Sequence, residues 1–211
     1  MGWGPLVQVS PHPLVAAKLK TLRDKTAPPE TFRQKLHELT VLLLYEALAD
    51  LEVMSSSVKT PIATAAAVEL TEKILFVPVW RAGDGMVQAA LSLVTTATVS
   101  HVGVYRKEST VTPVPYYNRL DRDAPGTLAV ILDPMLATGG TACLVSKFLK
   151  DRGARRVKYV GIIGAPEGVG RLRAAHPDVS INLAAIDWQL NDRAYIVPGI
   201  GDAGDRQFGT G

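Results

Sequence analysis

Hydrophobic and polar positions follow two different patterns along the chain, and the change comes near residue 74. Before that point, apolar residues recur at helical spacing, which predicts a helix from about Leu14 to Leu22 and a longer one ending near Asp50. After it, short apolar runs rich in β-branched residues alternate with helical segments. These patterns predict strands at 74–80, 99–105, 128–132, 157–163 and 181–185 and helices near 85–93, 140–152 and 168–175, with no convincing strand earlier in the chain.

The alternation of strands and helices indicates an α/β fold. Because the strand segments are apolar on both faces, we expect an open, mostly parallel sheet flanked by helices, with a ligand site beyond the carboxyl ends of the strands. Residues 1–211 are interpreted as a single domain. Within it we expect an N-terminal arm and helices over about 1–55, a projecting flap or hairpin over about 106–126 and a glycine-rich C-terminal segment over about 187–211.

Composition narrows the class of protein. Hydrophobic residues make up 47% of the 211 residues and charged residues 20%, which excludes a disordered or fibrous chain. No run reaches the roughly 18 apolar residues of a membrane-spanning helix, and the first residues do not resemble a signal peptide. The single cysteine, Cys143, forms no internal disulfide, so we expect a cytosolic protein without a membrane partner.

Charge does not by itself point to a partner. The net charge of +3 is too small to demand a nucleic acid. One basic cluster stands out, and we expect it to be a solvated surface at a helix end, with an anion or RNA patch as the alternative. It consists of Arg152, Arg155, Arg156 and Lys158.

The strongest local signal follows the strand predicted at 128–132. Asp133 stands at the end of this strand, and small residues up to Gly139 and Gly140 lead into a helix. Glycines let the backbone approach a ligand closely, and the free N–H groups at a helix start favour an anion. Thr138 and Thr141 add hydroxyl donors, so the loop is expected to bind a phosphate, with Asp133 facing sugar hydroxyls or a metal. The loop matches neither GxxxxGK[ST] nor GxGxxG.

This loop belongs to a longer motif, LDPMLATGGTA at 132–142, and three further segments accompany it: RAG at 81–83, VYR at 104–106 and YIVPGIGDAGDR at 195–206. The four motifs, in this order, resemble the uracil phosphoribosyltransferase family, a branch of the type I phosphoribosyltransferases. The resemblance covers nearly the whole chain from His12. It implies transfer of a phosphoribosyl group from phosphoribosyl pyrophosphate (PRPP) to uracil, which gives UMP and pyrophosphate in pyrimidine salvage.

The resemblance also implies which residues form the site. An arginine fork can grip two oxygens of a pyrophosphate, which suits Arg81 and Arg106 at neighbouring strand ends. The family pattern makes Asp202, Arg106 and Asp133 the catalytic residues. It assigns PRPP binding to Arg81, Arg106, Asp133, Pro134, Met135, Leu136, Ala137, Thr138, Gly139, Gly140, Thr141 and Asp202, and uracil binding to Ile196, Gly201, Asp202 and Ala203.

Cofactor and assembly follow from the same resemblance. Mg²⁺ is expected to arrive with PRPP rather than on direct protein ligands, because Pro134 stands where most branches carry a second acid. A homodimer or larger assembly is implied, with GTP as an activator in some members, and the sequence decides neither point. Two rival functions remain: a PRPP-sensing, RNA-binding regulator with the same fold, and an enzyme acting on another base.

Two residues depart from the family pattern, and one neighbouring pair has a separate expected role. Asp84 stands where the family usually has an apolar residue, and Trp80 where an aliphatic residue is commoner. Both substitutions fall beside the expected pyrophosphate site. Asp205 and Arg206 are expected to form an ion pair that braces the C-terminal loop.

Overall fold

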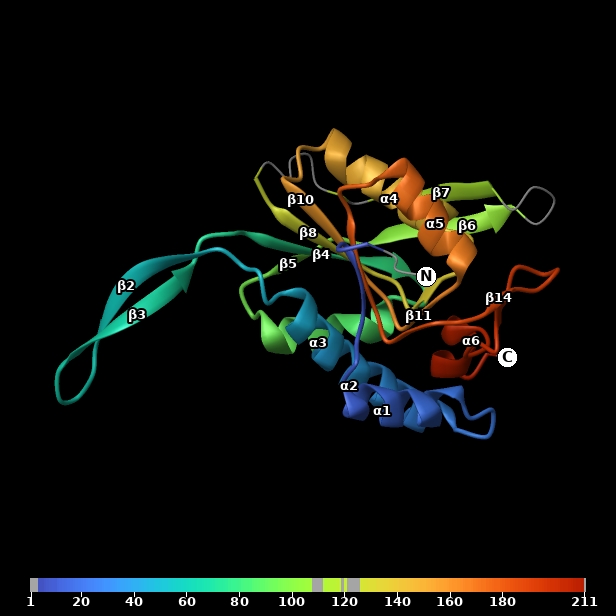
Figure 1. The fold of residues 1–211 in the computed structure, drawn as a ribbon, viewed down its shortest axis with the longest axis horizontal. Helices are drawn as coiled ribbons and strands as arrows, with labels where there is room; N and C mark the ends of the chain where they lie inside the picture. The colour runs from blue at the N-terminus through green and yellow to red at the C-terminus, as the bar shows by residue number, and fades with distance from the viewer. Residues whose placement is uncertain (1–3, 108–111, 119, 121–125, 211) are drawn as a thin grey trace.

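A twisted, mostly parallel sheet lies at the centre of the chain (Figure 1), and the computed structural model describes residues 4–107, 112–118, 120 and 126–210. For Arg106, Lys107, Thr112, Pro113 and Asn118 only the backbone is described. The strands of the central sheet are β1 (Val7–Val9), β4 (Ile74–Trp80), β5 (Thr98–Val99), β6 (Val102–Lys107), β7 (Thr112–Asn118), β8 (Leu128–Leu132), β10 (Arg156–Val160) and β12 (Ser180–Leu183). Their order is β1-β12-β10-β8-β4-β6-β7, with β5 beside β4. Only the β6–β7 pair is antiparallel among the described strands of this sheet.

Helices cover both faces of the sheet, as the apolar strand segments predicted. One face carries α1 (Pro13–Arg23), α2 (Pro29–Ala47), α3 (Asp84–Leu93) and α6 (Ala203–Phe208), and the other carries α4 (Gly140–Asp151) and α5 (Pro166–Ala175) (Figure 1). Phe32 and Phe76 lie in the core on the first side, and Ile131 and Leu149 in the core on the second. The expected fold class is confirmed. Among the described residues, no helix has the length and apolar character needed to cross a membrane.

Short strands extend the sheet at its carboxyl edge. They are the parallel set β9 (Met135–Leu136), β11 (Ile163–Gly164) and β13 (Ala185–Ile186), and the antiparallel pair β14 (Gln189–Leu190) and β15 (Ile196–Val197). The strands predicted at 157–163 and 181–185 are therefore each divided in two. The division occurs where the neighbouring chain bends at Pro134, whose carbonyl accepts hydrogen bonds from both Ile162 and Ile163.

The chain also contains strands before residue 74, so the expectation that none occurs there is wrong. β2 (Val53–Lys59) and β3 (Thr64–Leu70) form an antiparallel hairpin that projects far from the body of the molecule (Figure 1). Nearly every residue of these two strands is exposed, and their centres are runs of Ser and Ala. The alternation of apolar and polar residues that marks a half-buried strand is therefore missing. We call this hairpin the arm.

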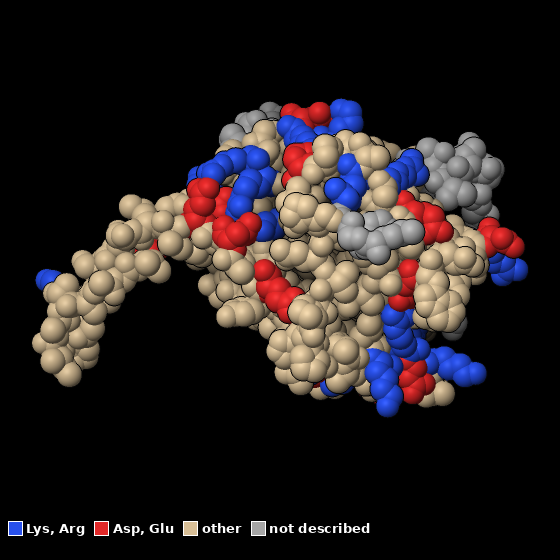
Figure 2. Space-filling view, viewed as in Figure 1, with Lys and Arg blue, Asp and Glu red and all other residues tan. Residues whose placement is uncertain are grey.

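Ion pairs fix the root of the arm to the sheet. Figure 2 shows basic and acidic side chains side by side at this root, while the arm itself has almost no charged residues. The pairs are Arg155–Glu52, Arg156–Glu72 and Lys158–Asp50. The expected solvated surface is wrong for Lys158, which is buried and also donates to the carbonyl of Ala47 at 2.6 Å. Three of the four cations of the expected basic cluster thus have acidic partners, whereas Arg152 donates to the carbonyls of Leu120 and Phe148.

Within the range expected for the flap, residues 106–107 and 112–118 belong to the antiparallel hairpin β6–β7. Residues 108–111, 119 and 121–125 of the expected flap lie outside the described residues. Trp80, at the end of β4, packs against this hairpin, with ring centroids 6.4 Å from Tyr116 and 5.7 Å from Tyr117. The aromatic residue that departs from the family pattern thus joins the flap to the sheet.

Candidate functional site

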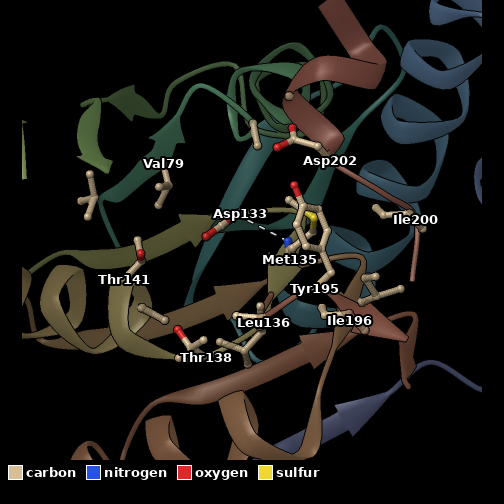
Figure 3. Close-up of a pocket in the computed structure, with 18 of the residues that line it drawn as sticks. Val79, Asp133, Met135, Leu136, Thr138, Thr141, Tyr195, Ile196, Ile200 and Asp202 are labelled. Carbon is tan, nitrogen blue, oxygen red and sulfur yellow. Dashed lines mark hydrogen bonds between the residues drawn. The ribbon is translucent and has the colours of Figure 1, made fainter. Parts of the chain in front are cut away.

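A cavity of about 830 Å³ opens beyond the carboxyl ends of the central strands (Figure 3). Its lining comes from the ends of β4 and β6, the loop that follows β8, the β14–β15 hairpin and the turn before α6. Eleven of the residues expected from the sequence line it: Arg81, Asp133, Met135, Leu136, Ala137, Thr138, Gly139, Thr141, Ile196, Gly201 and Asp202. Segments more than 100 residues apart in the sequence, such as Arg81 and Asp202, therefore meet at one cavity.

The loop from Asp133 to Gly139 forms one wall. It is held by backbone hydrogen bonds to the next strand, among them Ala165 N–H to Leu136 O at 3.0 Å. Gly139 has φ 75°, a conformation that favours glycine, and α4 begins at the next residue. The loop thus ends where the free N–H groups of a helix start point outward, the arrangement that favours a phosphate. Thr138 and Thr141 lie along the same wall (Figure 3).

Asp133 begins this wall (Figure 3) and is 8% exposed. Its Oδ1 lies 3.5 Å from the N–H of Met135. From below, the buried hydroxyl of Tyr159 on β10 donates to the backbone carbonyl of Asp133 at 2.9 Å. Burial and the Asp133 charge raise the pKa of Tyr159 well above its usual value, so this hydroxyl keeps its proton and its hydrogen bond at neutral pH. Sequence reasoning gave Tyr159 no role beyond the strand.

The C-terminal segment forms the opposite wall. Ile196 and Ile200 of this segment are buried, and Asp202 stands at its end (Figure 3). The Oδ1 atom of Asp202 accepts a hydrogen bond from the N–H of Asp205 at 2.9 Å and so caps α6. Tyr195, labelled in Figure 3, also lines the cavity, although sequence reasoning gave it no role. Its position directly before Ile196 in the same motif was the available signal.

Arg81 faces the C-terminal segment at the rim of the cavity. Its Nη2 lies 2.5 Å from Oδ1 of Asp205, and its Nη1 lies 3.3 Å from the hydroxyl of Thr210. Together Thr210 and Arg81 lower the pKa of Asp205. The expected pair between Asp205 and Arg206 is therefore wrong, because Asp205 has Arg81 as its partner. Arg206 donates instead to the carbonyls of Leu22, Asp24 and Ile200 and lies over the ring of Phe32.

Three other expected residues, Pro134, Gly140 and Ala203, are not among the described residues that line the cavity. Pro134 and Gly140 belong to the same loop, and Ala203 is buried at the first turn of α6. The backbone of Arg106 lies in β6, and its side chain is outside the described part. Asp84 does not line the cavity: His101 Nε2 lies 3.2 Å from its Oδ1, and its charge sits favourably at the first turn of α3.

The acidic groups at the cavity fit a metal that is shared with a ligand. Asp133 and Asp202 are the aspartates of the expected site that line it, on opposite walls. Within the described residues, no three His, Cys, Asp or Glu side chains gather as a metal cage. One or two carboxylates together with substrate phosphates are the ligands that Mg²⁺ commonly takes.

Comparison with known proteins agrees with this geometry. The family model described as uracil phosphoribosyltransferase matches residues 9–210. A uracil phosphoribosyltransferase from Roseiflexus castenholzii is 51% identical over 97% of this chain and 99% of its own. The solved structure of a protein from Aquifex aeolicus is 38% identical, with a TM-score of 0.92 over 97% of this chain and 98% of its own. A hypoxanthine phosphoribosyltransferase from Staphylococcus aureus shares the fold at 11% identity, with a TM-score of 0.50 over 75% of this chain and 76% of its own.

Proposed function

The chain belongs to the uracil phosphoribosyltransferase family, and we propose that its cavity transfers the 5-phosphoribosyl group of PRPP to uracil, giving UMP and pyrophosphate. One observation carries this proposal. The loop at 133–141, which we assign to the phosphate, and the segment at 196–202 form facing walls of the same cavity. A ribose held between them would join a phosphate on one side to a base on the other.

In this proposal the loop holds the ribose 5-phosphate. Backbone N–H groups at the start of α4 and the hydroxyls of Thr138 and Thr141 donate to the phosphate oxygens. Arg81 and Arg106 bind the pyrophosphate, because a guanidinium donates two parallel hydrogen bonds to such an anion. The pairing of Arg81 with Asp205 gives this arginine a fixed place at the rim before PRPP enters. The roles of Pro134 to Ala137 and of Gly139 and Gly140 are to shape this loop.

Uracil is a neutral, planar base whose edge alternates carbonyl acceptors with an N–H donor. Backbone groups of Ile196, Gly201 and Ala203 would match that edge, and Asp202 would lie by both the base and the ribose. The ring of Tyr195 adds an apolar surface at the same end of the cavity. This arrangement favours uracil because backbone donors and acceptors have fixed positions that a different edge, such as that of cytosine, does not match.

The reaction is a displacement at the anomeric carbon of ribose. A bond forms from a uracil ring nitrogen to this carbon as the bond to the pyrophosphate oxygen breaks, and the proton of that nitrogen passes to solvent. Positive charge builds on the sugar, where the carboxylates of Asp133 and Asp202 stabilise it. Holding both reactants between the two walls removes much of the entropic cost of bringing them together. Mg²⁺, bound mainly through PRPP, supplies charge neutralisation for the departing pyrophosphate.

The test is pyrophosphate release from PRPP and Mg²⁺ with uracil, cytosine, orotate, hypoxanthine or xanthine at matched concentrations, with products identified by mass. Release with uracil alone, with UMP as product, is the expected result. Release with another base would refute the uracil assignment. PRPP binding without any reaction would favour the regulator, and RNA binding would then be measured.

A variant tests the role of Asp202. Asp202→Asn keeps an oxygen that can cap α6 and removes the charge near the ribose. We expect turnover to fall strongly while PRPP affinity stays within about tenfold, or about 1.4 kcal/mol. Turnover close to that of the wild type would show that Asp202 has only the capping role.

We also propose a homodimer, and the arm supports it. Its large apolar side chains are exposed: Val53, Met54, Val58, Ile62, Val68 and Leu70. An isolated two-stranded hairpin is marginally stable in water, and exposed apolar groups in such number mark an interaction surface. The test is sedimentation of the wild type and of the variant Ile62→Glu. Ile62 lies at the tip of the arm and is 97% exposed. A wild-type monomer at micromolar concentration would refute the dimer. The cytosolic location and GTP activation stay predictions.

A further inference from the structure

An ion pair lies beneath the turn that we assign to the base. Arg23 is the last residue of α1, and it reaches Asp187, which follows β13. Its Nη1 lies 2.8 Å from Oδ2 of Asp187 and its Nη2 lies 2.6 Å from Oδ1, so the contact is bidentate. The Asp187 side chain is 5% exposed and that of Arg23 is 25% exposed. A bidentate pair at this depth fixes both side chains in one geometry.

Both members of the pair also hold the backbone of Gly199. Nη1 of Arg23 donates to the carbonyl oxygen of Gly199 at 2.9 Å, and the N–H of Gly199 donates to Oδ2 of Asp187 at 2.9 Å. Both polar backbone groups of this residue are thus occupied by the pair. Gly199 has φ +71°, and a Cβ there would lie 2.2 Å from the carbonyl oxygen of Ile196. The turn is therefore tight, and the pair holds it at its midpoint.

The position of this turn decides where the base contacts lie. Ile196 precedes Gly199 by three residues and Gly201 follows it by two, and both line the cavity. Neither Arg23 nor Asp187 lines the cavity. Recognition of a neutral base by backbone groups depends on their being held to within about 0.5 Å, because no charge pair compensates for a misplaced donor.

We propose that Arg23 and Asp187 are positioning residues that set the affinity for the base by fixing the turn at 196–202. The proposal rests on the proposed function, since it assumes that this turn binds uracil. It predicts that weakening the pair affects the base more than PRPP, because Asp202 is the one residue of this turn assigned to PRPP. The loop at 133–139, which carries most of the assigned PRPP contacts, makes no hydrogen bond with the pair among those described.

The test uses two conservative variants. Arg23→Lys keeps the charge and loses the bidentate contact, and Asp187→Asn keeps an acceptor for the N–H of Gly199 and loses the charge. We expect the KM for uracil to rise about tenfold in each, while the KM for PRPP stays within about twofold. In the double variant the KM for uracil should rise no further than in the worse single variant, because both changes break the same contact.

A matched control is available on the same helix. Lys18 pairs with Glu38 of α2 at 2.5 Å, with side-chain exposures of 26% and 25%. Lys18→Ala removes an ion pair of α1 that does not touch the C-terminal segment. We expect it to leave both KM values unchanged. Thermal unfolding of all variants at one protein concentration separates loss of the fold from loss of the turn geometry.

Hydrogen exchange of the amides at 196–202 gives a readout that needs no turnover. Exchange there should be faster in Arg23→Lys and Asp187→Asn than in the wild type and in Lys18→Ala. Equal exchange, an unchanged KM for uracil, or an equal rise of both KM values would overturn the proposal. A wild type that forms no UMP would refute the proposed function alone, because the exchange result would still decide whether the pair positions the turn.

Discussion

Removing Arg156 should destabilise the protein far more than removing its neighbour Arg155. Glu72 has a side chain only 2% exposed, and it accepts hydrogen bonds from Nε and Nη2 of Arg156 at 3.1 and 2.7 Å. Arg156→Ala would leave this carboxylate buried without its cation. Loss of one partner of a buried pair costs about 3–5 kcal/mol, and we expect the lower end, about 3 kcal/mol, because Arg156 is itself 28% exposed. For a domain of this size that lowers Tm by roughly 6–12 °C.

Arg155→Ala is the matched control, because Arg155 pairs with Glu52 at an exposed position, with side-chain exposures of 50% and 46%. Exposed pairs contribute little to stability, so its urea midpoint should stay close to that of the wild type. The assay is urea unfolding followed by far-UV circular dichroism at one fixed protein concentration. Glu72→Gln in the Arg156→Ala background should recover part of the loss, since it removes the buried charge. Equal, small effects of both arginine variants would refute the reasoning.

Three further predictions rest on separate contacts. A Cβ at Gly168 would lie 2.3 Å from the carbonyl oxygen of Ala137, in the loop assigned to PRPP, whereas a Cβ at Gly170 would meet no atom within 4 Å. Gly168→Ala should therefore displace this loop and raise the KM for PRPP about tenfold, and Gly170→Ala should not. Ala194 has φ 60°, a conformation that costs a non-glycine residue about 1–2 kcal/mol. Glycine avoids this cost but loses roughly 0.5–1 kcal/mol in conformational entropy, so Ala194→Gly should raise the urea midpoint. Hydrogen bonds from Lys18 and Lys35 lower the pKa of Glu38 from 4.5 to about 2. The stability from this group is present above about pH 4.5 and is lost as the pH falls toward 2, so Glu38→Gln should lose less stability than the wild type over that interval.

The loop at 133–139 shows how much the local sequence predicts. Gly139 and Gly140 after a buried strand carry their conformational meaning with them, because a positive φ and a helix start depend on a few adjacent residues. The aspartate at the strand end could likewise be placed on the carboxyl edge of the sheet from the order of apolar segments. Asp133 and Gly139 line the cavity as the sequence predicted, whereas Gly140 begins α4 outside the lining.

Pairings between segments that are distant in the sequence could not be predicted in this way. Asp205 and Arg206 are adjacent, which suggested an ion pair, yet the side chains point in different directions from α6, one to Arg81 and the other to carbonyls near the end of α1. The arm was missed for a related reason. Strand prediction relies on a buried face, and the described residues of the arm have none.

The sequence by itself determined the α/β class, most of the helices, the loop at 133–139 and the family, because hydrophobic period, glycine placement and motif order are read directly along the chain. Only the tertiary structure decided which charges meet: Arg23 with Asp187, Arg81 with Asp205 and Arg156 with Glu72. Such pairs depend on where whole helices and strands come to rest, and a Coulomb contact or hydrogen bond acts over a few ångströms that sequence separation does not specify.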